Sequence, residues 1–521
     1  MTFYGKFIQN LLNFRSVIMN NNNPNFLIFV VDEMQSFTVG CNGNKEVKTP
    51  NIDKIADEGV TFKRAYCNNP VCCPSRSTMI TGLTPRQHGC LYNDIISPKN
   101  VPTITETLVR HGYRTHSVGK HHFQHFGGGY GDSAESRKGW MNGDIKSLPE
   151  MYYGFQTSDF VGGHVNYCFG DYVNWLVANH PNVYDKYKSE NAYYKKDEVN
   201  AWRMEVPAEL HYNAWIADRS IDFINSLKDD ENFFLWCSFP DPHEPFAACK
   251  PYSEMYNPDN ITLNPSWAIE SGLSIESGDL THLKKMRKGL IEHLDEQSLR
   301  EAVAQTYGMI THIDYNIGRV LKHLEEKGLE DNTIIVFMAD HGDYLGSHNL
   351  LFKNVWPYEE VVRVPFIWKV PGAYNPGTVS EDIVSLLDFA PTILSYVDID
   401  QDEMDFKWII GGKGQVDHIW LPGRSLKKYL ESGEKLKKKP AIIEFDTNPY
   451  GGPCYRVRTI VEEKYKMAIF PINGGGMLFN LENDPNELNN LYNNPEFTKI
   501  RAELTEKLLF ELVRTDRKGG L

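Results

Sequence analysis

Cysteine is scarce in this sequence, and so are long apolar runs and positive charge. The 521 residues include 9 cysteines, an odd number that is too small for a disulfide scaffold. No apolar run reaches the roughly 18 residues of a membrane-spanning helix, so we expect no membrane protein. The 54 Lys and Arg residues stand against 68 Asp and Glu residues, a net charge of −14. That balance disfavours nonspecific binding to nucleic acid or to anionic membranes.

The N-terminal segment lacks the features of a secretory signal. Residues 1–24 contain no long apolar stretch and no small-residue cleavage site. We interpret them as an N-terminal extension and expect a cytoplasmic, reduced protein. The whole chain is 41% hydrophobic and 12% aromatic, which is enough for a large folded core. Its length fits about three domains or one large α/β core with insertions.

Uninterrupted apolar runs indicate a central sheet. Such runs are typical of strands that are buried on both faces. They are found at 26–31, 233–237 and 334–339, with a weaker example at 113–118. Helical periodicity is found next to them, at 51–58, 103–110, 215–227 and 302–324. The pattern predicts an α/β fold with a large, mixed, mostly parallel sheet sandwiched by helices.

The sequence pattern changes near residue 400. We predict a catalytic domain at 25–400, with irregular insertions at about 127–202 and 246–297. The remainder, 401–521, is predicted to be a smaller α+β subdomain. Its short β runs indicate an antiparallel sheet, at 441–445, 456–461, 465–470 and 477–481, before a helix at 497–513. The aromatic residues of the first insertion either pack that segment or line a substrate pocket.

Charged and imidazole side chains follow each predicted strand. Ligands of open α/β sheets bind beyond the carboxyl ends of the strands. The residues at these ends include Asp32, Lys120, His243, Asp340 and His341. Two neighbouring carboxylates repel each other unless a cation lies between them, so Asp32 and Asp340 favour Ca²⁺ or Mg²⁺ over zinc. Each aspartate taken alone could equally cap a helix or a turn.

The segment from Cys72 to Arg76, CCPSR, carries the sharpest signal. Pro74 suits the first turn of a helix, which would place Cys72 at a helix N-terminus. The helix dipole favours an anion there, and Arg76 adds fixed positive charge one turn on. Two interpretations remain open from the residues alone: a nucleophile that faces an anionic substrate, or a buried structural cysteine.

This segment resembles the signature of the type I, formylglycine-dependent sulfatases of the alkaline phosphatase superfamily. That signature is Cys-x-Pro-Ser-Arg followed by Thr-Gly, here Thr81-Gly82. TPNIDKIADEGVTFKRAY resembles the helix that follows the family's first strand. Other segments resemble the same family, namely PNFLIFVVDE, GKHHF, PDPHEPF, ADHGDYLGSHNLLFKN, YEEVVRVPFI and LFNLENDPNELNNL. The resemblance covers most of the chain and implies an alkaline phosphatase-like fold.

The resemblance also implies a chemistry for the signature. Cys72 would be converted to formylglycine by a maturation enzyme, whereas Cys73 would stay a thiol. The hydrated aldehyde has two hydroxyls, of which one attacks sulfur and the second lets sulfate leave. Residue 72 would hold one divalent cation, Ca²⁺ or else Mg²⁺, together with Asp32, Asp340 and His341.

Further roles follow from the same resemblance. Arg76 and Lys120 would hold the formylglycine and neutralise charge, and His122 would bind or deprotonate its hydroxyls. His243 and Lys353 would contact the sulfate and the leaving oxygen, and one of the two would be the general acid. Glu33 stands where the family has Asp or Gln.

The expected function is therefore hydrolysis of an aryl, alkyl or sugar sulfate, with release of inorganic sulfate. One alternative is a phosphodiester or phosphonate monoester hydrolase built on the same site. Another is a non-catalytic protein that binds sulfated glycans, which the intact set of site residues disfavours. We expect a sulfated small molecule or carbohydrate and the maturation enzyme as partners, and neither nucleic acid nor membrane.

Overall fold

The structure is a computed structural model of the 521-residue chain. It describes residues 23–93, 95–99, 101–127, 132–187, 194–196, 199–267, 295–353, 355–399, 408–410, 415–417, 421–446, 456–470 and 475–516. The N-terminal extension expected at 1–24 lies outside these residues up to position 22, as does 268–294 of the second insertion. Within the described ranges, no helix is long and apolar enough to cross a membrane.

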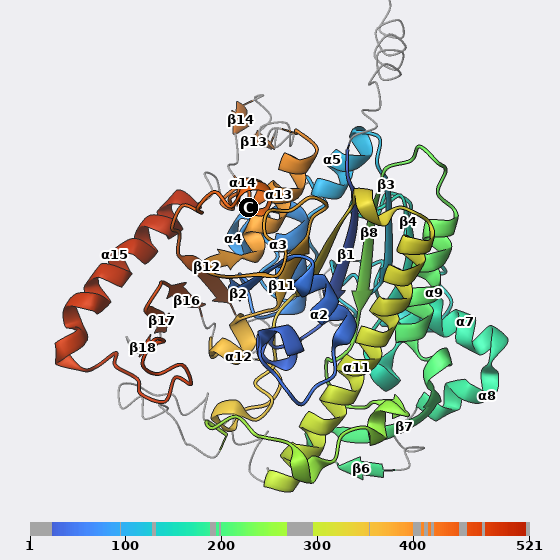
Figure 1. The fold of residues 1–521 in the computed structure, drawn as a ribbon, viewed down its shortest axis with the longest axis horizontal. Coiled ribbons are helices and arrows are strands. Elements are labelled where there is room, and N and C mark those ends of the chain that lie inside the picture. Colours follow the sequence, from blue (N-terminus) through green and yellow to red (C-terminus); the bar gives the residue numbers. More distant parts are fainter. Residues whose placement is uncertain are drawn as a thin grey trace, which may run out of the picture.

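A nine-stranded sheet runs through the centre of the molecule (Figure 1). Its order is β12-β2-β11-β10-β1-β8-β3-β4-β5. The strands are β1 (Asn25–Val31), β2 (Val60–Tyr66), β3 (Arg114–Gly119), β4 (Thr157–Gly162), β5 (Phe169–Gly170), β8 (Phe233–Phe239), β10 (Thr333–Ala339), β11 (Phe366–Lys369) and β12 (Thr378–Ser385). β11 is antiparallel to both neighbours and β5 to β4, and the other pairs are parallel. The predicted large, mixed, mostly parallel sheet is confirmed.

The central strands are buried along their whole length. Every residue of β1, β8 and β10 is buried, as their apolar runs predict for strands covered on both faces. The weaker prediction at 113–118 corresponds to β3 and is also confirmed.

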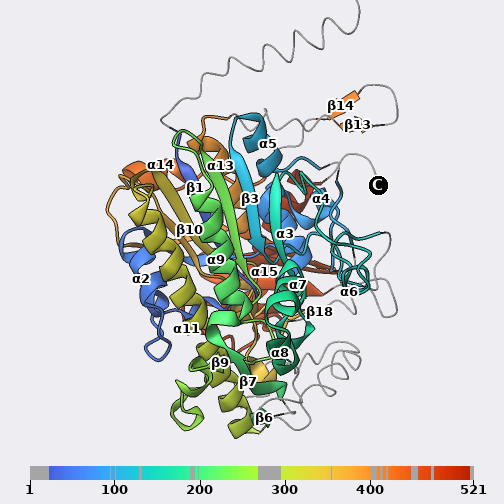
Figure 2. The ribbon, with the colours of Figure 1, turned by 90° about the vertical axis from the view of Figure 1, so that its right-hand side faces the viewer.

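Helices cover both faces of this sheet (Figure 2). One layer consists of α2 (Pro50–Asp57), α9 (Tyr212–Asn225) and α11 (Glu296–Glu326). The other layer consists of α3 (Cys72–Thr81), α5 (Ile104–Arg110) and α13 (Phe389–Tyr396). The side chain of Asp295 caps α11 by accepting from the Ser298 N–H, which explains why that helix begins earlier than its apolar spacing indicates. The predicted helices are otherwise present.

The stretch TPNIDKIADEGVTFKRAY contains the helix predicted at 51–58, which is α2 and ends at Asp57, and then β2, which begins at Val60. The first insertion contributes β4 and β5, which extend the sheet beyond β3. Most of its aromatic residues are buried in the core, which favours their packing role over a pocket lining; these are Trp140, Tyr152, Tyr153 and Trp202.

A second, antiparallel sheet follows in the chain. It consists of β15 (Ala441–Asp446), β16 (Arg456–Val461), β17 (Tyr465–Phe470) and β18 (Gly475–Asn480), and α15 (Thr498–Arg514) comes after it. The predicted antiparallel sheet and closing helix are confirmed. One face packs against α15, and the other packs against the segment after β10 that includes Tyr344 and Tyr358. The domain boundary at residue 400 stays a prediction.

The remaining elements are short. Two small sheets are formed by β6 (Tyr194–Lys196), β7 (Ala201–Pro207) and β9 (Cys249–Lys250), and by β13 (Trp408–Ile410) and β14 (Gln415–Asp417). The short helices are α4 (Pro85–His88), α6 (Arg137–Met141), α7 (Asp171–Asn179), α8 (Pro181–Tyr184), α12 (Glu359–Val362) and α14 (Lys427–Ser432).

Candidate active site

The carboxyl ends of adjacent strands bring the predicted residues together. β10, β1, β8 and β3 are neighbours in this order and run parallel. Asp340 and His341 follow β10, Asp32 follows β1, His243 follows β8 and Lys120 follows β3. These strands share one sheet, so the convergence expected of the residues at their ends is met.

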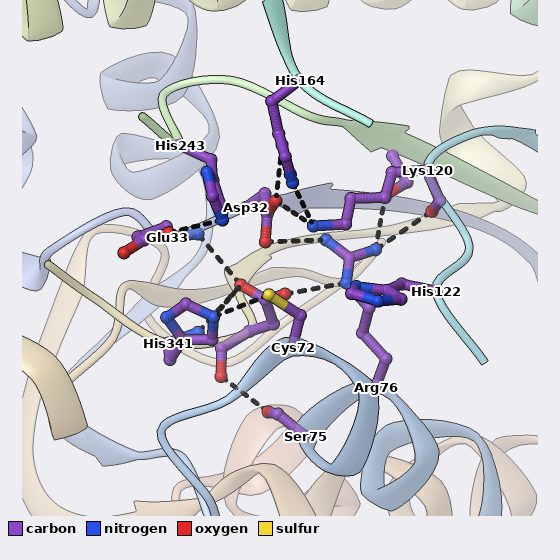
Figure 3. A network of polar contacts seen from close by, with 12 residues as sticks. Asp32, Glu33, Cys72, Ser75, Arg76, Lys120, His122, His164, His243 and His341 are labelled. Carbon is purple, nitrogen blue, oxygen red and sulfur yellow. Dashed lines mark hydrogen bonds and ion pairs between the residues drawn. The ribbon is translucent and has the colours of Figure 1, made fainter. Parts of the chain in front are cut away.

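Helix α3 points its N-terminus into the same place. It begins at Cys72, as Pro74 predicts, and every one of its ten residues is buried. The Sγ atom of Cys72 lies 3.1 Å from Nε2 of His341 (Figure 3). The hydroxyl of Ser75 donates to the carbonyl of Asp340 at 2.6 Å, which ties the first turn of α3 to the end of β10.

Arg76 contacts both Asp32 and Asp340, and its approach to Asp32 can be followed in Figure 3. Its Nε donates to Oδ2 of Asp340 at 2.7 Å, and one terminal nitrogen lies 3.6 Å from Oδ1 of Asp32. The other terminal nitrogen donates to the carbonyl of Lys120 at 3.0 Å and to Ser238 Oγ at 2.8 Å. Nζ of Lys120 pairs with Oδ2 of Asp32. Two buried carboxylates and two buried cations thus compensate each other.

One atom from each of four side chains fits a divalent cation. Asp32, Cys72, Asp340 and His341 each offer a ligand-type atom, and these atoms lie within 4.8 Å of one another. Oδ1 of Asp32 is buried and accepts no hydrogen bond from the described residues. His341 donates from Nδ1 to the carbonyl of Gly342 at 3.0 Å, so its Nε2 presents a lone pair to the group. Carboxylate oxygens with one imidazole suit a divalent cation.

The electrostatics favour an anion at position 72. Burial alone would raise the pKa of Cys72, but the positive charges of Lys120 and Lys353 outweigh burial and hold it well below its usual range. Burial lowers the pKa of His122 to about 4, against the opposing effect of its hydrogen bond to Cys72. A neutral imidazole beside residue 72 can accept a proton from it.

His243 and Lys353 form a second group around Glu33. Nε2 of His243 lies 2.9 Å from Oε2 of Glu33 and 2.7 Å from Nζ of Lys353, and that Nζ also pairs with Glu33. Burial would raise the pKa of Glu33, but His243 and Lys353 lower it to about 2. The backbone of Glu33 has φ 61° and donates to Oδ1 of Asp340 at 3.0 Å. Its carboxylate therefore pairs with the two cations and does not join the four-residue group.

His164 is a site residue that the sequence reasoning missed. Its ring stacks on His243 with centroids 3.5 Å apart, and its Nε2 lies 3.4 Å from Nζ of Lys120 (Figure 3). Its Nδ1 lies 3.5 Å from Oδ2 of Asp32. The preceding Gly163 has φ 75°, a backbone conformation that favours glycine. A Gly-Gly-His turn after a parallel strand was the available signal, but this strand was not predicted.

Glu135 is a second missed residue, and it fixes the loop that carries His122. Its buried carboxylate accepts the backbone N–H groups of His122, Phe123 and Gln124 at 2.8 to 3.1 Å, and the hydroxyl of Tyr152 at 2.6 Å. His122 itself has φ 53°, a conformation that non-glycine residues adopt only when their surroundings hold them there.

Replacing this carboxylate should loosen the loop. In Glu135→Gln the amide offers one acceptor oxygen and turns an NH₂ toward backbone donors. We therefore expect the unfolding free energy to fall by about 1–3 kcal/mol. We also expect a lower kcat, because the loop that carries His122 is held less firmly. Urea unfolding and steady-state kinetics at pH 8 would measure both. The exposed Glu150→Gln is the matched control and should change neither. Wild-type stability and kcat in Glu135→Gln would refute this role.

The difference in unfolding free energy between the wild type and Glu135→Gln should depend on pH. Burial raises the pKa of Glu135 from 4.5 to about 7, so the folded chain holds this proton more tightly than the unfolded chain. The unfolding free energy of the wild type, relative to Glu135→Gln, should therefore fall as pH rises from 4.5 to about 7 and stay level above it.

Comparison with known proteins identifies the family of this chain. A family model described as sulfatase matches residues 24–399. The chain belongs to the sulfatase family. A second model, described as the C-terminal part of N-sulphoglucosamine sulphohydrolase, matches residues 346–514 of this sulfatase.

Individual relatives cover nearly the whole sulfatase. An arylsulfatase of Clostridium perfringens is 30% identical over 505 residues, 95% of each chain. An N-acetylglucosamine-6-O-sulfatase of Bacteroides thetaiotaomicron is 25% identical and covers 93% of this chain and 85% of its own. The solved phosphonate monoester hydrolase of Agrobacterium radiobacter shares the fold, with a TM-score of 0.76, 22% identity and coverage of 95% and 96%. This sulfatase is a sulfuric ester hydrolase.

Proposed function

We propose that this sulfatase cleaves its ester with formylglycine at position 72 and one divalent cation, most simply Ca²⁺. The observation that carries the proposal is the position of Cys72, at the N-terminus of α3 and 3.1 Å from His341. Formylglycine there, as its hydrate, would supply two hydroxyls on one carbon, one for attack on sulfur and one for release of sulfate. A maturation enzyme would make the conversion.

Asp32, Asp340 and His341 would hold the cation together with residue 72. The mutual approach of their ligand atoms supports this assignment, as does Oδ1 of Asp32, which accepts no hydrogen bond from the described residues. A divalent cation there would polarise the nucleophile and a sulfate oxygen. Hard oxygen ligands with a single imidazole favour Ca²⁺ or Mg²⁺ over zinc.

The other site residues would handle protons and charge. His122, neutral in its buried position, would take the proton of the attacking hydroxyl. Glu244 and Glu33 overcome the effect of burial and raise the pKa of His243 well above its usual range, so its ring stays a donor. His243 and Lys353, 2.7 Å apart, would together stabilise the leaving oxygen, and either can protonate it.

The proposed substrates are sulfated carbohydrates and aryl sulfates. The names of the two curated relatives support these classes, and together they span sugar and aryl esters. A small-molecule sulfate ester carries one negative charge, which the cations of Lys120, His243 and Lys353 would neutralise.

Sulfate should be preferred over phosphonate at this site. A sulfate ester presents three non-bridging oxygens, whereas a phosphonate monoester replaces one of them by carbon and would leave a buried donor unpaired. We expect kcat/KM for an aryl sulfate to exceed that for the matched aryl phosphonate monoester by roughly 100-fold, or about 2.7 kcal/mol. Both esters should be assayed on one preparation with a known formylglycine content. A larger kcat/KM for the phosphonate would support the phosphonate hydrolase instead.

A further inference from the structure

A second cluster of ligand-type side chains lies outside the active site. His211 precedes α9, Cys249 lies in β9, and His312 lies in the middle of α11. All three are buried, and one ligand-type atom of each lies within 4.8 Å of the others. None of them belongs to the groups of acidic and imidazole side chains around residue 72. Three segments that are distant in the sequence thus place a thiol and two imidazoles together.

The thiol and one imidazole stand at the spacing of zinc ligands. Sγ of Cys249 lies 3.6 Å from Nδ1 of His312. In a tetrahedral site with Zn–S of about 2.3 Å and Zn–N of about 2.0 Å, sulfur and nitrogen are about 3.5 Å apart. Burial lowers the pKa of His312 to about 3, against the effect of its hydrogen bond to the backbone of Ala208. The ring is therefore neutral and can offer a lone pair.

The second imidazole brings an atom that the protein leaves unpaired. Nε2 of His211 is buried and has no hydrogen-bond partner among the described residues. The residue is 1% exposed, and burial together with His312 lowers its pKa well below its usual range. Its Nδ1 accepts from the Asn213 N–H at 3.3 Å, a long contact. Ligation through Nε2 would move the proton to Nδ1 and end that contact. Buried imidazole nitrogens without partners are uncommon and call for an explanation.

We propose that His211, Cys249 and His312 form a binding site for a divalent transition metal, with zinc as the bound ion. Cys249 releases its thiol proton to solvent as the Zn–S bond forms, and both imidazoles bind as neutral ligands. Thiolate and imidazole ligands select zinc over Ca²⁺ and Mg²⁺, which bind oxygen. Three protein ligands leave the fourth tetrahedral position for water.

A buried carboxylate lies next to this cluster. The carboxylate of Asp241 accepts hydrogen bonds from Asn213 Nδ2 at 2.8 Å and from the Tyr212 hydroxyl. Both partners directly follow His211 in the chain. Zinc bound to one thiolate keeps one positive charge, which a nearby carboxylate can balance. Carboxylates that surround metal ligands commonly hold them in place and balance their charge.

The site would clamp the segment that carries His243. The chain passes from His243 to Cys249 in six residues, and zinc would tie its far end to α11 and to the start of α9. This zinc site is independent of formylglycine and of the cation of the active site.

Cobalt absorption tests the site in the full-length chain. Cys72→Ala serves as the background because it removes the thiol of the active-site group, where ligand-type side chains of the described residues also gather around a cysteine. After chelator treatment, one equivalent of Co²⁺ should give a thiolate-to-cobalt charge-transfer band and the d–d bands of tetrahedral cobalt. Cys249→Ser should abolish the charge-transfer band. Cys237 is another buried thiol, whose sulfur accepts from the Ser220 hydroxyl at 3.3 Å. Cys237→Ser should leave the charge-transfer band unchanged.

If Cys249→Ser does not fold, a measurement on a protein that keeps all three ligands can still test the zinc site. X-ray absorption of the zinc-loaded Cys72→Ala chain should show one sulfur at about 2.3 Å beside nitrogen neighbours. Absence of the charge-transfer band, its persistence in Cys249→Ser, or a zinc shell made only of oxygen and nitrogen would overturn the proposal. The cluster would then be a hydrogen-bonded thiol between two neutral histidines.

Discussion

Cys72→Ala is expected to abolish sulfate release, with kcat/KM reduced by roughly 10⁴-fold or more. The substitution leaves the β-carbon of residue 72 as an unreactive methyl group that cannot carry the proposed hydroxyls, and the nearby Ser75 hydroxyl is already bound to the carbonyl of Asp340. The residual rate would come only from the cations around the substrate. Initial rates on an aryl sulfate, with metal content held equal, would measure the loss.

Cys73→Ala is the matched control for this experiment. Sγ of Cys73 lies 3.3 Å from Sγ of Cys90 and 3.5 Å from the carbonyl of Ile95, so it faces away from His341. We expect this variant to keep most of the wild-type kcat. Peptide mass analysis should show the thiol-to-aldehyde change at residue 72 and none at residue 73. Equal losses in both variants, or full activity with an unmodified thiol at 72, would contradict the proposed chemistry.

Arg76→Gln should destabilise the chelator-treated protein strongly. Without the guanidinium, the buried carboxylates of Asp32 and Asp340 lose the cation that they share, while Lys120 still pairs with Asp32. Leaving a buried charge without its partner costs roughly 3–5 kcal/mol. Urea unfolding in chelator would measure this loss. Added Ca²⁺ should reduce the difference from wild type, because a cation between the carboxylates replaces part of the missing charge.

Arg514→Gln separates this effect from the general loss of an arginine. Arg514 pairs with Glu511 at 2.6 Å, and its side chain is 44% exposed, so its removal should cost at most about 1 kcal/mol. Equal stability of the two variants in chelator would show that Arg76 does not balance the aspartates. Catalysis should distinguish them too, since only Arg76→Gln should lower kcat/KM, by roughly 10²-fold or more.

The sheet and the residues at its strand ends could be predicted because both depend on local sequence. An apolar run without charge, as in β1 or β10, marks a strand covered on both faces. The first polar residue after such a run lies at the carboxyl end of the strand, and this rule alone places Asp32 and Asp340 there. The short motif at Cys72 fixed the start of α3 in the same way.

Other parts of the site depend on contacts that the sequence does not encode locally. Glu33 is the neighbour of Asp32, yet its backbone at φ 61° directs its carboxylate to His243 and Lys353. His164 and Glu135 reach the site from an insertion with no clear periodicity. Their roles follow from how that insertion docks, which is a tertiary property.

The complete burial of α3 sets an order of events in the life of the protein. All ten residues of this helix are buried in the folded chain, and Cys72 is 1% exposed. An enzyme that modifies Cys72 must therefore reach it before α3 docks against the sheet. If residue 72 becomes formylglycine as proposed, folding and modification would compete in time, and a molecule that folded first would stay an inactive precursor. Slower folding during production should raise the active fraction, whereas treatment of the purified precursor should not.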